Sequence, residues 1–185
     1  PEQKPSASTD KPAASKPSAS KPSTSKPSAD KHDTDKANKP SSPLNLLNTV
    51  WKSYSEDDKF PASGGDYSEE NAKDDAPGKF DVSDSAVLES TLAVPEDSAD
   101  LLKKAASLTH MMNLNTFTAG AFQLKDSKNV DKFAKAMKES IENRRWVCGF
   151  PDKFVIIKGN GYVVSAFGAE DLIDTFKSKT LKAYQ

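Results

Sequence analysis

The first 43 residues contain no Ile, Leu, Val, Met or aromatic residue, and this absence confines a folded core to the rest of the chain. The same stretch holds eight of the twelve prolines, and Lys-Pro recurs in it on a short period. Such a segment buries too little apolar surface to offset the conformational entropy that is lost on folding. We therefore predict a disordered, extended Lys-Pro-Ser stalk over residues 1–42, followed by a single domain over residues 43–185.

Charge is spread unevenly along the chain. Residues 44–90 carry eleven acidic side chains against four lysines, whereas the stretch on either side has three more basic than acidic residues. The sequence shows no concentrated basic face of the kind that binds nucleic acid, so we expect no nucleic-acid partner. It also has no apolar run long enough to span a bilayer.

The spacing of apolar residues predicts four helices and three strands. Apolar positions that recur every three or four residues indicate helices, and runs of β-branched and aromatic residues indicate strands. We expect helices at about 43–55, 97–112, 129–147 and 169–182, and strands at about 116–124, 153–158 and 162–167. The fold class predicted from this order is α+β, with a small three-stranded sheet packed by the helices.

Two further features concern the connections. Asn160-Gly161 between the last two predicted strands is a strong hairpin signal, and a crossover helix before this hairpin would leave strand 162–167 in the centre of the sheet. Residues 56–85 are rich in Asp, Glu, Ser and Gly, so we predict an acidic irregular loop inside the domain. Its acids lack the alternating ligand pattern of a calcium loop, which favours a solvated loop over a calcium site. These acids are Asp57, Asp58, Asp66, Glu69, Glu70, Asp74 and Asp75.

The segment 158–165 (KGNGYVVS), the acidic pair 170–171 and the helical pattern over 130–141 carry a family resemblance. From about residue 110 to 183 the sequence resembles an uncharacterised family of secreted lipoproteins of Gram-positive bacteria, the domain of unknown function 4358. The resemblance implies a lipid anchor on a cysteine upstream of Pro1, and a location at the extracellular face of the cell membrane or in the secreted fraction. It implies no particular activity.

Few residues suit catalysis. A nucleophilic thiol needs a nearby base, so Cys148 and His110 support the alternative of an envelope accessory enzyme. A single cysteine next to apolar residues is more often a buried structural thiol, and we therefore expect no enzymatic activity.

His110-Met111-Met112 has the ligand types of a Cu(I) site, but the side chains of consecutive residues on a helix point in different directions and cannot converge on one ion. We expect core methionines beside a histidine that caps a helix end, with no metal and no cofactor.

The protein's two arginines, Arg144 and Arg145, stand together beside Trp146. Arg and Trp dominate binding hot spots, and Arg grips a carboxylate through two parallel hydrogen bonds. Either these residues bind a partner, or one arginine is an internal clamp on the acidic loop while Trp146 fills the core. Because Ile141 and Arg145 share the inward stripe of the predicted helix, Arg144 is expected to be the exposed arginine.

Together these observations predict a non-enzymatic, stalk-anchored module of the bacterial cell surface. Its partner is expected to be an unknown protein or a carboxylate-bearing ligand, bound by Arg144, Arg145 and Trp146. We expect the protein to be a monomer and to touch the membrane only through the upstream lipid anchor.

Overall fold

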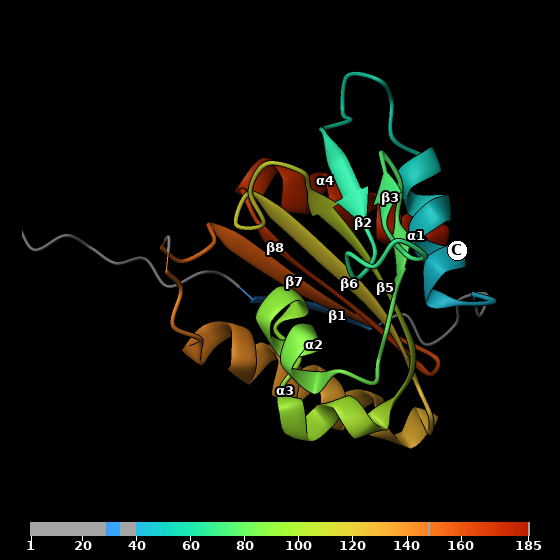
Figure 1. Ribbon diagram of the computed structural model, residues 1–185, viewed down its shortest axis with the longest axis vertical. Coiled ribbons are helices and arrows are strands. Elements are labelled where there is room, and N and C mark those ends of the chain that lie inside the picture. Colours follow the sequence, from blue (N-terminus) through green and yellow to red (C-terminus); the bar gives the residue numbers. More distant parts are fainter. Residues whose placement is uncertain (1–28, 34–39, 148, 185) are drawn as a thin grey trace, which may run out of the picture.

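An eight-stranded sheet lies between two layers of helices in the computed structural model, which describes residues 29–33, 40–147 and 149–184 (Figure 1). One face of the sheet is covered by α1 (Pro43–Lys52) and α4 (Glu170–Ala183), and the other by α2 (Ser85–Leu92) and α3 (Val130–Asn143). Each face has its own cluster of buried apolar side chains. The predicted α+β class is confirmed.

The strands are β1 (Ala29–Asp33), β2 (Ala62–Gly64), β3 (Lys73–Asp74), β4 (Gly78–Phe80), β5 (Leu102–His110), β6 (Phe117–Leu124), β7 (Lys153–Gly159) and β8 (Tyr162–Gly168). Their order across the sheet is β1-β7-β8-β6-β5-β2-β3, and β4 pairs with β5 on the same side as β2. All pairings are antiparallel except β1 with β7. β8 pairs with β6 and β7, which confirms the central place predicted for strand 162–167.

The predicted sheet of three strands is wrong, chiefly because the segment predicted to be a helix at 97–112 contains the strand β5. A six-residue 3₁₀ helix, η1 (Glu96–Leu101), leads directly into this strand, so the helix expected at 97–112 does not exist. Within this segment Ala105 and Leu108 pack on opposite faces of the sheet, and Met112 is exposed. Both faces of β5 are buried from Ala105 to Thr109, so the strand shows none of the polar alternation that would reveal it.

The other three predicted helices are present with shifted ends. Ser42 caps α1 as expected, since its Oγ accepts a hydrogen bond from the Asn45 N–H at 3.0 Å. α3 stops at Asn143 and not at 147, and α4 runs from Glu170 to Ala183. The fourth helix of the structure, α2, was not predicted. It is capped by the Asp84 carboxylate, which accepts from the Val87 N–H at 3.1 Å.

Residues 56–85, predicted as an irregular loop, contain the short strands β2, β3 and β4. Two buried hydroxyls of β5 attach this segment to the sheet. Ser107 Oγ accepts from the Gly65 N–H at 2.9 Å and donates to the Gly65 carbonyl at 3.1 Å. Thr109 Oγ1 lies 3.0 Å from Ser63 Oγ and donates to the Ser63 carbonyl at 3.2 Å. The segment is therefore an ordered edge of the sheet and not a free loop.

One acid of this segment serves an internal role. The Asp66 carboxylate accepts hydrogen bonds from the Ser68 N–H and hydroxyl, the Asn71 amide and the Asp81 N–H, at 2.6–3.1 Å. Desolvation alone would raise the pKa of Asp66, but these bonds together outweigh it and lower the pKa. In the described part of the chain, no three His, Cys, Asp or Glu side chains gather closely enough to hold a metal ion.

The N-terminal part of the chain differs from the predicted stalk in one place. Residues 29–33, expected to be disordered, form β1 along the outer edge of β7. The rest of 1–39 lies outside the described residues. Where the description resumes, the Pro40 carbonyl accepts a hydrogen bond from the Tyr162 hydroxyl at 2.8 Å. No helix among the described residues is both long enough and apolar enough to cross a bilayer.

Candidate functional site

The residues predicted to bind a partner lie at the end of the sheet where β5 ends and β6 begins. Two loops lie next to each other at this end, on the left of the sheet in Figure 1. They are the β5–β6 loop (111–116) and the α3–β7 loop (144–152). Between them is an open hollow of about 130 Å³. Its wall is formed by Leu114 and Asn115 of the first loop, Arg145 and Trp146 of the second, and Phe167 at the end of β8.

Arg144 is a clamp inside the protein. Its Nη1 donates to the Glu89 carbonyl and its Nη2 to the Ser90 carbonyl, each at 2.6 Å. Both carbonyls belong to the last turn of α2. Carbonyl groups in the last turn of a helix lack some of their intrahelical N–H donors, and the helix dipole favours a positive charge there. The expectation that Arg144 is the exposed arginine is wrong, since only 20% of its side chain is accessible and Arg145 is the exposed one. Helix α3 ends at Asn143, so the helical spacing of its apolar residues does not determine where the Arg144 and Arg145 side chains point.

Substitution of Arg144 by lysine is expected to destabilise the fold. One ammonium group cannot donate to both carbonyls of α2 in the planar geometry that the guanidinium provides. Losing one hydrogen bond from a charged donor should cost about 1.5 kcal/mol or more in the free energy of unfolding, measured by chemical denaturation. Arg145→Lys is the matched control and should leave stability unchanged. Equal losses in the two variants would contradict the clamp.

Trp146 closes the site from the side of the core. It is half-buried, its Nε1 donates to the Ile141 carbonyl at 3.1 Å, and its ring meets Phe167 edge-on at 5.0 Å. The Arg144 guanidinium stacks over the same ring at 5.2 Å. Arg145 has no hydrogen bond or ion pair with any described residue. Trp146 therefore presents a fixed apolar wall beside a free positive charge.

Four large apolar side chains are exposed on the same two loops, and we call them the apolar end. Their exposed fractions are 51% for Met111, 79% for Met112, 94% for Val147 and 60% for Phe150. The expectation of core methionines is wrong because the segment 111–116 is a connection between strands and not the end of a helix. Met111 and Met112 are exposed because they follow the last residue of β5 in a loop at the end of the sheet.

A lysine next to these loops is held in the charged state. Lys153, the first residue of β7, pairs with Asp174 at 2.7 Å and with Glu170 at 3.4 Å, both on α4. The hydrogen bond that Lys153 donates to Asp174, helped by Glu170, raises the pKa of Lys153. This amine is therefore a structural cation and not an available base.

His110 has contacts that suit a structural role. Its ring stacks on Phe60 with centroids 5.7 Å apart, and its Nδ1 accepts from the Met112 N–H at 3.2 Å. It caps a turn after a strand, and not a helix end as expected. Cys148, the other half of the predicted catalytic pair, lies outside the described residues, so the Cys148–His110 pair stays a prediction.

Comparison with protein-family models, with curated proteins and with solved structures yielded no match to this chain.

Proposed function

We propose that this chain is a non-enzymatic binding module of the bacterial cell surface and that the apolar end is its recognition surface. The observation that carries the proposal is the exposure of Met111, Met112, Val147 and Phe150 on two neighbouring loops. Large apolar side chains that are exposed on adjacent loops are candidates for an interaction site in a soluble protein, and Val147 also lines the hollow between these loops. The surface location and the lipid anchor rest on the family resemblance and on the composition of residues 1–42.

The chemistry around the hollow suggests what kind of partner fits. Leu114, Trp146 and Phe167 offer an apolar wall, and a hollow of about 130 Å³ is close to the roughly 150 Å³ that houses one small ring. Arg145 lines the hollow, and its guanidinium, which has no ion pair with any described residue, suits a carboxylate. The partner we propose is a protein segment that places one apolar side chain in the hollow and an Asp or Glu on Arg145. Arg144 then takes part only by holding the loop against α2.

Selection from a displayed library of random peptides tests this function. We expect the selected peptides to combine an apolar side chain with an Asp or Glu. A Val147→Ser/Phe150→Ser variant should bind them about tenfold more weakly or worse, since buried apolar anchors dominate binding energy. Arg145→Gln should weaken only peptides that retain their acid. Affinities are measured by calorimetry with the full chain.

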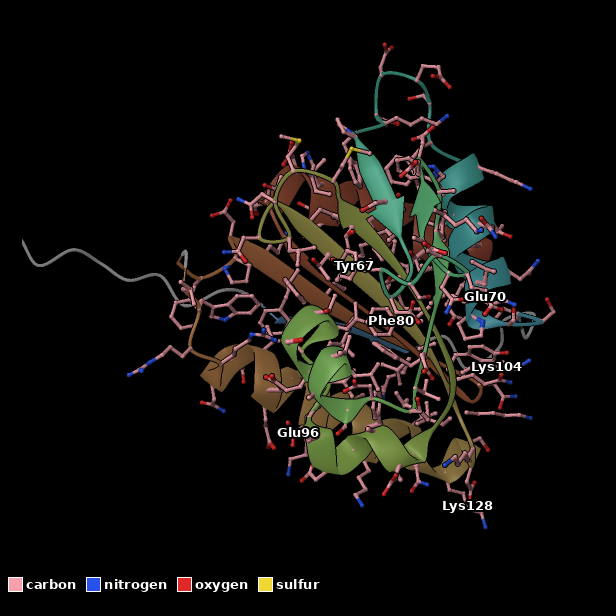
Figure 2. The ribbon with its side chains drawn as sticks, in the orientation of Figure 1. Tyr67, Glu70, Phe80, Glu96, Lys104 and Lys128 are labelled. Atoms are coloured by element: carbon pink, nitrogen blue, oxygen red, sulfur yellow. The ribbon has the colours of Figure 1, made fainter. Side chains whose placement is uncertain are left out.

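Tyr67→Ser provides a matched control, because Tyr67 is as exposed as Phe150 but lies on the loop between β2 and β3. Figure 2 shows it in front of the sheet. The proposal fails if the selected peptides bind the apolar-end variant as well as the parent chain.

If the protein is a dimer that Phe150→Ser dissociates, the partner bound at the apolar end is a second copy of the chain. Rapid alkylation of Cys148 in the folded protein near neutral pH would instead favour the enzyme alternative.

A further inference from the structure

A row of three hollows follows the opposite end of the sheet, where β5 begins and β6 ends. The first lies between the β7–β8 hairpin and the start of α3, the second between that hairpin and β5, and the third between β5, β4 and the start of α1. Their volumes are about 440, 420 and 320 Å³. Ser127 and Gly161 line both the first and the second, and Lys103 lines both the second and the third. The hollows therefore adjoin one another around this end of the sheet, and together we treat them as one groove.

Lysines line this groove along its whole length, and we call it the lysine groove. Five of them are exposed and have no ion pair with any described residue: Lys79, Lys103, Lys104, Lys125 and Lys128. Figure 2 labels Lys104 and Lys128 on the outside of this end of the molecule. Elsewhere in the described fold Lys138 and Lys179 lie in ion pairs with neighbouring acids, whereas Lys52, Lys73, Lys132 and Lys182 have no ion pair with a described residue. The groove therefore gathers five lysines without an ion pair to any described residue at one end of the sheet.

The acids of the groove do not balance these cations. Asp131 pairs with Lys158 at 2.7 Å, and Asp126 accepts a hydrogen bond from the Lys128 N–H at 2.9 Å. Asp81 accepts from the Ser83 N–H and hydroxyl at 2.9 and 2.7 Å. With Lys158 included, six lysines face three aspartates that already have partners. The first turn of α3 adds partial positive charge beside the first hollow, because Asn129 gives it no side-chain cap.

We propose that the lysine groove binds a linear polyanion made of phosphate groups without bases. A row of open hollows suits an extended chain and not a single enclosed phosphate. Lysine ammonium groups act as point charges, which contact phosphates without selecting a planar partner. The one aromatic residue that lines the groove, Phe80, is buried, so bases would find nothing to stack on. These features favour a phosphate polymer without nucleobases over a single-stranded nucleic acid.

The proposal is independent of the function assigned to the apolar end, because the two surfaces share no residue. Binding of inorganic polyphosphate to the full chain over a series of salt concentrations tests it. The logarithm of the affinity should fall linearly with the logarithm of the salt concentration. Lys103→Gln/Lys125→Gln should flatten this slope by about 1.4, for two contacts at roughly 0.7 each, and should weaken binding at every salt concentration.

Lys52→Gln/Lys73→Gln is the matched control, because it removes two exposed lysines that do not line the groove. It should keep the parent slope, and Phe150→Ser should bind polyphosphate like the parent chain. Three results would overturn the proposal: equal effects of the two lysine pairs, tighter binding of single-stranded DNA than of polyphosphate at equal phosphate concentration, or displacement of polyphosphate by an equal concentration of monomeric phosphate. Equal effects would mean that net charge, including that of residues 1–39, is all that matters.

Discussion

Replacing Val164 with proline is expected to abolish folding. Val164 is fully buried in β8, where it pairs with Ala121 of β6 and Ile157 of β7. A proline there removes a backbone N–H from the centre of the sheet and introduces a ring between two strands that are already paired. The cost of about 3 kcal/mol or more is a large share of the roughly 5–15 kcal/mol by which a domain is stable. Circular dichroism and the dispersion of amide NMR signals measure the outcome.

Val164→Ala separates the effect of the backbone from that of the side chain. It removes two methyl groups from the core and should cost about 2 kcal/mol while the protein still folds. A proline variant that keeps a native spectrum and melts within a few degrees of the parent chain would show that β8 is not a central strand.

The second large effect is expected for Gly78→Ala, at the crossing of three backbone segments. A Cβ on Gly78 would lie 2.5 Å from both the Asn71 carbonyl oxygen and the Gly65 nitrogen. These atoms belong to the backbone, so no side-chain rotation can relieve the overlap, and the backbone at 64–65 and at Asn71 must move away from Gly78. We expect a loss of about 3 kcal/mol in the free energy of unfolding, measured by denaturation.

Gly149→Ala is the control for this prediction, because it tests backbone conformation without crowding. Gly149 has a φ of +89° and no heavy atom within 4 Å of its potential Cβ, so alanine there should cost only about 1 kcal/mol. Proteolysis of the segment 56–84 provides a second readout, since only the Gly78 variant should expose it. Equal costs for the two variants would mean that the three segments do not meet in solution.

Local sequence patterns were sufficient for the elements that have one polar and one apolar side or a strong turn. α1 follows from the Ser42-Pro43 cap and its apolar stripe, and the β7–β8 hairpin follows from Asn160-Gly161. The central place of β8 follows from the helix that must cross the sheet between β6 and β7. In each case the deciding residues lie within one or two elements of each other along the chain.

The candidate site was predicted only as a neighbourhood. The pairing of Arg and Trp drew attention to residues 144–146, and the structure places them beside a hollow. The roles within the group could not be read, because Arg144 meets carbonyls 54 and 55 residues earlier in the chain. The exposed methionines were missed for a related reason: their position depends on β5 being a strand.

Composition was enough to locate the core, and periodicity was enough to locate the elements that have one solvent-facing and one buried side. The remaining elements depend on packing between distant segments. Ala105 and Ala106 favour a helix locally, but as small residues they also fit a strand covered on both faces, and packing between the helix layers selects the strand. The same packing brings Ser107 against Gly65, 42 residues away, and aligns lysines from separate elements into one groove. Such contacts have no local signature, because their energy arises only when distant segments exclude water together.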